Sequence, residues 1–237
     1  METPRGLTPP VVSLTYDGSR MSHLEIVLPQ LKEFGFKATF YAEPTSLLDD
    51  YPSWRAAHEQ GHEIGNGTLL SSALEDGSLP AWTPQMLLDD LDEANDLLKE
   101  LFPGQVKHSI GLPWGDGTCA GGVPYGPFLA RAYEVVRSGN VGFNFSGATS
   151  VNALSHIAAE DLSGRELIEI VKRGIYEDAW TVIALDGVGS GERSIDAAAH
   201  RELLEFLDSN KTLVKVIPVI DMALDYFLQP SSRASIH

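Results

Sequence analysis

Asp17 is the residue in this sequence that is best placed to do chemistry. It follows residues 11–16, where β-branched and aromatic residues predominate, and it precedes Gly18. This pattern predicts a buried strand that ends at Asp17. In α/β barrels and open α/β sheets, ligands bind at the carboxyl ends of the strands. Asp17 is therefore either a turn residue before a glycine or an acid or base at the mouth of a site.

Cys119 and two tryptophans are further candidates. Cys119 is the only cysteine, which excludes an internal disulfide and a zinc cluster of thiolates. It lies in a glycine-rich loop, where it is either a nucleophile or, more commonly, an incidental cysteine. Trp114 and Trp180 lie near the ends of predicted strands. Each either stacks against a sugar ring or packs in the core.

The histidines do not suggest a metal site. None of them shows a two-histidine spacing beside a carboxylate on one face of an element. His62 and Glu63 are adjacent in a predicted strand, so their side chains point to opposite faces. We interpret both as structural residues.

Strand-like and helix-like stretches alternate along the chain and must position these residues. Strands are predicted at residues 11–17, 38–41, 62–66, 107–112, 141–145, 180–185 and 213–218. Helices are predicted at residues 24–34, 52–60, 84–101, 125–137, 164–176, 195–207 and in a closing segment through 227. This order predicts an α/β fold with a parallel sheet and right-handed crossovers. We expect one barrel-like domain over residues 1–237, with its core at 11–227 and a loose tail at 230–237.

The charge balance restricts the possible partners. The chain has 17 Lys and Arg against 33 Asp and Glu, a formal net charge of -16. Such a surface repels nucleic acid and anionic membranes and suits uncharged or cationic ligands better. The sequence has no run of about 18 apolar residues and its first residues lack the pattern of a secretion signal. We therefore expect a soluble cytoplasmic protein, although a signal trimmed from the chain would leave the same picture.

Five short motifs occur in a recognisable order at the predicted strand ends. They are TYDG at 15–18, ATFY at 38–41, GHEIGNGT at 61–68, LPWG at 112–115 and TVIALDGVG at 181–189, the last followed by HRELL at 200–204. Together they resemble the polysaccharide deacetylase family, also called the NodB-homology domain or carbohydrate esterase family 4. The resemblance covers roughly residues 11–227 and implies a distorted (β/α) barrel of about seven strands.

The family's chemistry requires parts that this chain mostly lacks. The family removes acetyl groups from N-acetylated sugars with an Asp-His-His metal site, an Asp base and a His acid. The metal polarises the carbonyl and activates water, the base removes the proton of the water, and the acid protonates the leaving amine. By the resemblance, the second aspartate falls at Gly18, the metal histidines at Gly67 and Ser71, the base-orienting arginine at Gly111 and the acid at Asp186.

These replacements imply that the motif site holds no metal and uses no cofactor. Glycine offers no side-chain ligand, and a serine hydroxyl is a poor ligand for a zinc-like ion. Asp17 then corresponds to the base or, if one aspartate has been deleted, to the metal ligand.

The sequence therefore predicts a polysaccharide deacetylase-like protein that is related to carbohydrates and lacks ordinary metal-dependent N-deacetylation. We expect Asp17 and Asp186 to be the catalytic candidates and a glycan or small molecule to be the ligand. The candidate ligand-binding residues are Tyr16, Pro113, Trp114, Gly115 and Trp180. One alternative is a metal-independent hydrolase of non-peptide C–N bonds that uses Asp17 and Asp186. Another is a non-catalytic scaffold or partner-binding protein.

Overall fold

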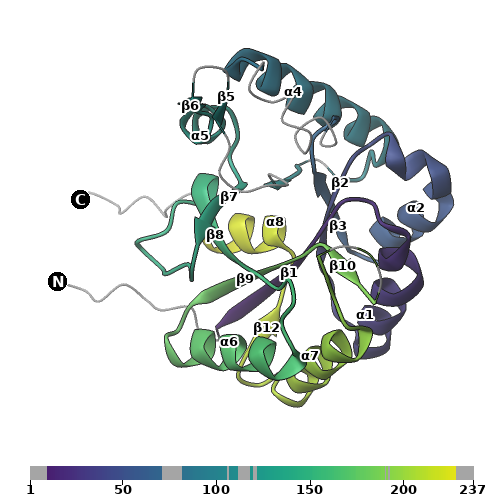
Figure 1. Cartoon of the computed structure of the whole chain (residues 1–237), viewed down its shortest axis with the longest axis vertical. Helices are drawn as coiled ribbons and strands as arrows, with labels where there is room; N and C mark the ends of the chain where they lie inside the picture. Colours follow the sequence, from purple (N-terminus) through teal and green to yellow (C-terminus); the bar gives the residue numbers. More distant parts are fainter. Residues whose placement is uncertain are drawn as a thin grey trace, which may run out of the picture.

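The computed structural model describes residues 10–70, 82–105, 107–111, 118–119, 122–189, 191 and 193–227. Its main sheet is entirely parallel and has the strand order β12-β1-β2-β3-β4-β7-β8-β9 (Figure 1). Strand β9 pairs again with β1, so seven strands close a barrel, and β12 pairs with the start of β1. The strands are β1 (Val11–Asp17), β2 (Thr39–Ala42), β3 (Glu63–Asn66), β4 (Ile110–Gly111), β7 (Val136–Val141), β8 (Leu154–Ala158), β9 (Trp180–Leu185) and β12 (Lys215–Val216). The predicted barrel of about seven strands is confirmed.

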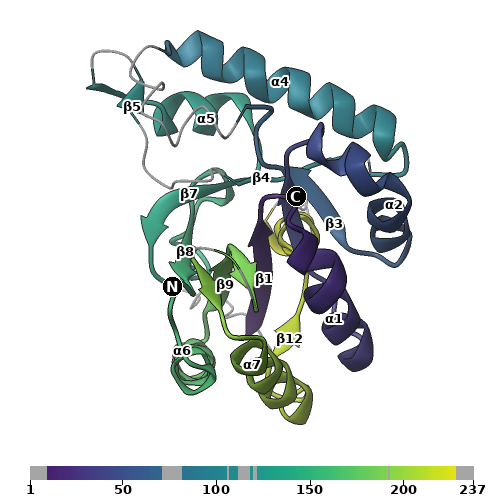
Figure 2. The ribbon, with the colours of Figure 1, turned by 45° about the vertical axis from the view of Figure 1, so that its right-hand side comes forward.

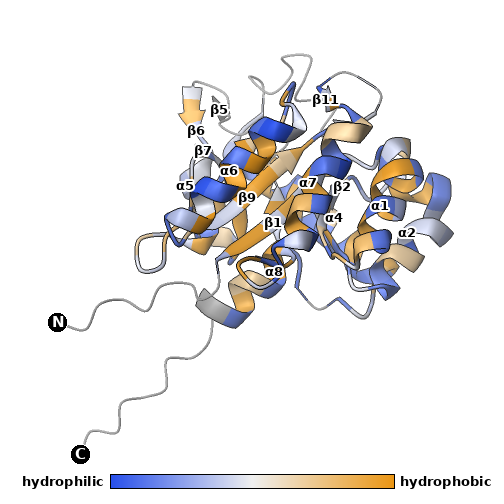
Figure 3. Cartoon of the chain, turned by 90° about the horizontal axis from the view of Figure 1, so that it is seen from below, coloured by the Kyte–Doolittle hydropathy of each residue, from blue (hydrophilic) through white to orange (hydrophobic). Residues whose placement is uncertain are grey.

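Helices surround this barrel, with their polar residues turned outward (Figure 3). They are α1 (Leu28–Phe34), α2 (Tyr51–Glu59), α4 (Pro84–Leu101), α5 (Gly126–Ala132), α6 (Gly164–Tyr176) and α7 (Ala197–Ser209). The short α8 (Val219–Met222) instead packs against inner residues of the barrel. Local signals fix several helix starts. Thr83 accepts the backbone N–H of Met86 ahead of Pro84, and Ser163 and Glu166 form a capping box. Within the described part of the chain, no helix is long and apolar enough to cross a membrane.

Strand β1 separates the barrel interior from the layer of helices. Val12, Leu14 and Tyr16 belong to the main hydrophobic core, which includes residues of the helices α1 and α7. The alternate residues face inward, where Ser13 accepts a hydrogen bond from Trp180 and Thr15 accepts one from Arg137. Asp17 shares this inner face at the carboxyl end of the strand. Figure 2 shows β1 beside β9 in the wall of the barrel.

Glu63 holds α8 against the inside of the barrel. Its carboxylate accepts hydrogen bonds from the Thr39 hydroxyl at 2.6 Å, the Ser109 backbone N–H at 2.9 Å, the Ser109 hydroxyl at 2.6 Å and the Ile220 N–H at 3.0 Å. His62, on the opposite face, accepts the N–H of Ala38 through Nδ1. Both residues thus make structural contacts, and they do so on opposite faces, as the alternation predicted.

The sequence prediction fails in the segment between α5 and α6. The helix predicted at residues 125–137 ends at Ala132, and the strand predicted at 141–145 lies instead at Val136–Val141. Strand β8 was not predicted. Both strands are only partly buried, so their side chains lack a clear hydrophobic alternation.

Candidate functional site

Asp17 and Asp186 lie next to each other at the carboxyl-terminal mouth of the barrel. Asp17 ends β1, and Asp186 directly follows β9. The two strands pair in parallel with Tyr16 opposite Leu185, so the two aspartates extend the same register. Adjacent strands are about 4.8 Å apart. The aspartate side chains are 16% and 20% exposed, respectively, which leaves both in reach of a ligand.

A buried arginine fixes the orientation of Asp17. Nη2 of Arg137 lies 2.6 Å from Oδ2 of Asp17, and its Nη1 donates to Thr15 at 2.8 Å. The Arg137 side chain is only 1% exposed, and its guanidinium lies over the ring of Tyr41 at 4.7 Å from the centroid. The other oxygen of Asp17, Oδ1, is buried and has no hydrogen-bond partner among the described residues.

Arg137 is the residue of the candidate site that the sequence interpretation missed. The family's orienting arginine was expected at Gly111, where a Cβ atom would lie 2.3 Å from the Tyr41 ring. A Cβ at Gly65 would also contact this ring, at 2.7 Å. Tyr41 therefore fills the space beside both glycines, and an arginine reaches Asp17 from β7 instead. One sequence signal could have placed Arg137 in a strand: it directly follows Val135 and Val136, and such β-branched residues are enriched in strands.

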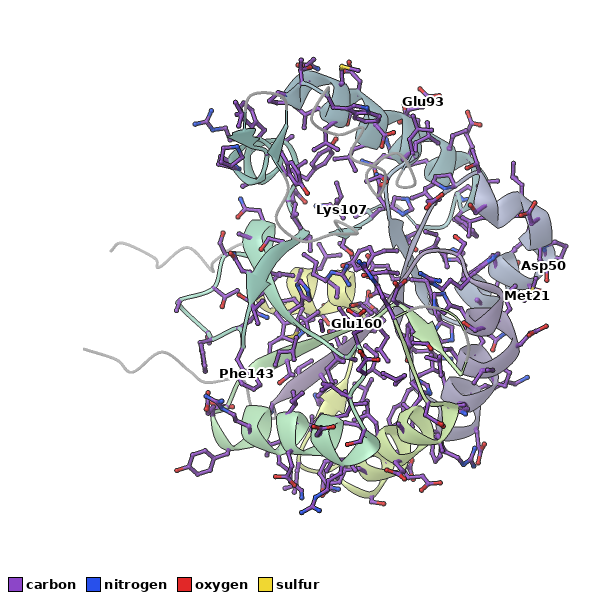
Figure 4. The ribbon with its side chains drawn as sticks, in the orientation of Figure 1. Met21, Asp50, Glu93, Lys107, Phe143 and Glu160 are labelled. Atoms are coloured by element: carbon purple, nitrogen blue, oxygen red, sulfur yellow. The ribbon has the colours of Figure 1, made fainter. Side chains whose placement is uncertain are left out.

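Asp186 is held by Arg20 and His23. Arg20 donates to Oδ1 through Nε at 2.9 Å, and its Nη2 lies 2.6 Å from the same oxygen in an ion pair. Nε2 of His23 donates to the backbone carbonyl of Asp186 at 2.6 Å. Arg193 and Glu160 form a looser pair, with 3.7 Å between Nε and Oε1. Glu160 follows β8 and lies near the middle of the view in Figure 4.

The surroundings of the two carboxylates shift their pKa values upward. Burial is the main cause and raises the pKa of both groups, whereas Arg137 opposes this shift at Asp17 and Arg20 opposes it at Asp186. The negative charge of Asp17 raises the pKa of Asp186 further. The two groups are therefore electrostatically coupled: when one carboxylate takes up a proton, the pKa of the other falls.

At Gly67, where the resemblance places a metal histidine, the structure leaves no room for a side chain. Gly67 directly follows β3, and a Cβ atom there would lie 2.9 Å from the carbonyl carbon of Tyr41 and 3.0 Å from the backbone nitrogen of Ala42. The backbone itself closes this position to a side-chain ligand. No group of three or more His, Cys, Asp or Glu side chains in the described ranges could hold a metal ion. Ser71 lies outside these ranges.

Two of the predicted ligand-binding residues lie elsewhere than expected. Tyr16 is fully buried on the helix side of β1, with its hydroxyl 2.7 Å from Nε2 of His200. Trp180 is also fully buried, at the opposite end of β9 from Asp186, where its Nε1 donates to Ser13. Neither ring can stack against a ligand at the mouth, because strand alternation and strand direction place them in the core. Pro113, Trp114, Gly115 and the side chain of Cys119 lie outside the described residues.

Comparisons with known proteins agree with this fold. Residues 5–118 match the family model described as polysaccharide deacetylase. No curated protein matches the chain. Among solved structures, a family 4 acetyl xylan esterase from Clostridium thermocellum has a TM-score of 0.60 at 18% identity and covers 90% of each chain.

Two deacetylases give similar values. The peptidoglycan deacetylase PdaC from Bacillus subtilis has a TM-score of 0.58 at 15% identity and covers 94% of this chain and 93% of its own. The catalytic domain of a peptidoglycan N-acetylglucosamine deacetylase from Eubacterium rectale has a TM-score of 0.61 at 15% identity, covering 91% and 90%. At these identities the similarity establishes the fold, which is the barrel of these enzymes.

Proposed function

We propose that the protein binds a carbohydrate ligand at the barrel mouth, around Asp17 and Asp186, without catalysing metal-dependent N-deacetylation. The contact between Arg137 and Asp17 carries this proposal. It gives Asp17 the arginine partner that the family provides for its base, so Asp17 corresponds to the base and not to the metal ligand. The proteins that share the fold are described as an acetyl xylan esterase and peptidoglycan deacetylases, which supports a carbohydrate as the ligand.

The positions of the metal ligands support the second half of the proposal. If Asp17 is the base, the aspartate ligand falls at Gly18 and a histidine ligand at Gly67, and neither glycine has a side chain. A zinc site needs at least three protein ligands. The contacts at Gly67 also leave no room for a side chain in the present backbone.

A second candidate function is hydrolysis of a C–N bond by the carboxylate pair alone. The adjacency and coupling of Asp17 and Asp186 favour it. Asp17 would take a proton from water as the water oxygen attacks the carbonyl carbon. The C–N bond would then break, and a protonated Asp186 would give its proton to the leaving nitrogen. Burial and the charge of Asp17 both raise the pKa of Asp186, which favours the protonated form that this role requires.

Binding, metal content and hydrolysis should be measured on the same preparation. We expect chitotriose or xylotriose to shift backbone NMR signals of residues around Asp17 and Asp186, and Asp17→Asn to weaken this binding. The control Asp96→Asn changes the same charge on an exposed part of α4 and should bind like the wild type. We also expect substoichiometric metal and no acetate release with added zinc. Stoichiometric metal that is lost in Asp17→Ala, together with zinc-dependent acetate release, would refute the proposal.

The same assay separates the second candidate function. Amine release that persists in the presence of a chelator and disappears in both Asp17→Asn and Asp186→Asn would establish hydrolysis by the pair. If the chelator abolishes the release, or if either variant retains it, the pair does not perform the reaction.

A further inference from the structure

Each of the two mouth carboxylates engages an arginine through only one oxygen. Arg137 binds Oδ2 of Asp17, and both contacts of Arg20 go to Oδ1 of Asp186. Oδ1 of Asp17 is buried without a hydrogen-bond partner among the described residues. A buried acceptor without a partner costs free energy, so a hydrogen-bond donor that reaches this oxygen would remove that cost.

The arginines and His23 keep this arrangement in place. Arg137 is confined by Thr15 and by the ring of Tyr41, and it is almost completely buried. His23 fixes the backbone of Asp186 through its carbonyl oxygen. The carboxylates therefore do not need to reorganise before a ligand binds, which lowers the cost of binding.

We propose that this mouth receives a protonated amine, so that the preferred carbohydrate is an amino sugar with a free amine and not its N-acetylated form. The inference rests on the proposed function, since it specifies which carbohydrate binds between Asp17 and Asp186. An ionised carboxylate only accepts hydrogen bonds, and an ammonium group offers three donors and no acceptor. An acetamido group offers one N–H and a carbonyl oxygen, which carboxylates repel.

Two charge effects favour the ammonium group. The chain carries a formal net charge of -16, which attracts cations toward the protein. Burial disfavours the ionised form of both aspartates. Arg137 and Arg20 offset part of this penalty, and a cation between the two carboxylates would offset more of it. Hydrogen bonds between charged partners are also roughly twice as strong as those between neutral ones.

Three trisaccharides with the same β-1,4 linkage test the inference by calorimetry and NMR titration: the glucosamine trimer, chitotriose and cellotriose. We expect the glucosamine trimer to bind at least about tenfold more tightly than chitotriose, the factor that one charge-assisted hydrogen bond supplies. We expect Asp17→Asn and Asp186→Asn each to remove most of this preference. Asp96→Asn removes the same charge far from the mouth, on α4, and should retain it.

The outcomes distinguish this inference from the proposed function. If chitotriose binds as tightly as the glucosamine trimer or more tightly, the preference for an amine is wrong while a carbohydrate site at the mouth remains. If Asp96→Asn loses the preference for the glucosamine trimer as fully as the mouth variants do, this preference reflects the overall charge of the protein. The inference is then overturned. If none of the three sugars shifts signals at the mouth, both proposals fail. Should Asp17→Asn fold poorly, the more exposed Asp186→Asn provides the same test alone.

Discussion

Arg137 and Asp17 are separated by 120 positions in the sequence, yet their side chains meet with 2.6 Å between Nη2 and Oδ2 at the centre of the barrel mouth. The pair depends on Tyr41, whose ring supports the guanidinium and fills the space beside Gly65 and Gly111. Tyr41 is held in turn by the Ser109 hydroxyl, which contacts Glu63. A continuous set of polar contacts thus runs from the mouth to α8 and fixes the charged groups in the barrel.

Replacing Arg137 with Gln should destabilise the protein by about 3 kcal/mol or more, because it leaves the carboxylate of Asp17 buried without its partner. The pKa of Asp17 should rise as well, since Arg137 is the main group that lowers it. Urea denaturation measures the stability. The control Arg55→Gln breaks an exposed i,i+4 pair with Glu59 and should change stability little. Equal losses of stability in the two variants would contradict the claim that the pair of Arg137 and Asp17 is buried and structurally important.

Gly67→Ala should cost about 1–3 kcal/mol, because its Cβ would meet the backbone of Tyr41 and Ala42 and not a flexible side chain. Thermal or urea unfolding measures this cost. Gly126→Ala is the matched control, since no atom beyond its chain neighbours and its own helix backbone lies within 4 Å of its added Cβ. Gly67→His should be still less stable and should not bind zinc. A Gly67→His variant that is as stable as the wild type and binds zinc would show that the position can accept a ligand.

Strong local signals explain which elements the sequence predicts correctly. The helix at 164–176 begins with a capping box, and the strand at 180–185 is a continuous buried run, so both match their predicted bounds. The run of β-branched and aromatic residues at 11–16, followed by Asp17 and Gly18, predicted a strand that ends at Asp17, which is where β1 ends. These features depend on neighbours in the sequence and on the periodicity of each element.

The contents of the barrel centre could not be predicted in the same way. Whether position 111 has room for a side chain depends on where the Tyr41 ring lies, which no local pattern encodes. Arg137 was assigned to a helix because the weak alternation in β7 hid the strand. Tyr16 was considered for ligand binding because it lies in a motif, and Trp180 because it lies at the end of a predicted strand. Both side chains are buried in the structure, so they pack in the core.

Glu63→Gln should loosen α8. The amide nitrogen of Gln cannot accept hydrogen bonds, so one of the two sets of donors, those around Oε1 or those around Oε2, loses its acceptor. We expect a loss of about 1–3 kcal/mol in stability. Hydrogen exchange should become faster at the Ile220 amide if the amide nitrogen replaces Oε2, or at the Ser109 amide if it replaces Oε1. Exchange of Val182 in β9 should change no more than the global stability requires. Unchanged exchange at both Ile220 and Ser109 would show that the Glu63 carboxylate does not anchor the helix.

Protonation of His200 should destabilise the protein in acid. Its Nδ1 donates to Gln30 and its Nε2 accepts from Tyr16, each at 2.7 Å, so both ring nitrogens are used in the neutral form. Burial lowers the pKa of His200 from 6.5 to about 3. The unfolded chain therefore binds a proton at a higher pH than the folded chain does. The contribution of this group is complete above about pH 6.5 and is lost progressively as the pH falls toward 3.

The His200→Gln variant should therefore lose stability more slowly than the wild type between pH 6.5 and pH 4. The difference between the two slopes should approach about 1.4 kcal/mol per pH unit, the value for one proton. The comparison with the wild type is needed because other groups also make the stability depend on pH. Asp17 and Glu63 have raised pKa values, so their protonation favours the folded protein as the pH falls, opposite to the effect of His200. Tyr16→Phe is the control: it removes the hydroxyl partner but keeps the titrating ring, so it should lower stability without flattening the slope. If His200→Gln and the wild type show the same slope in urea denaturation across this range, His200 is not the group that titrates.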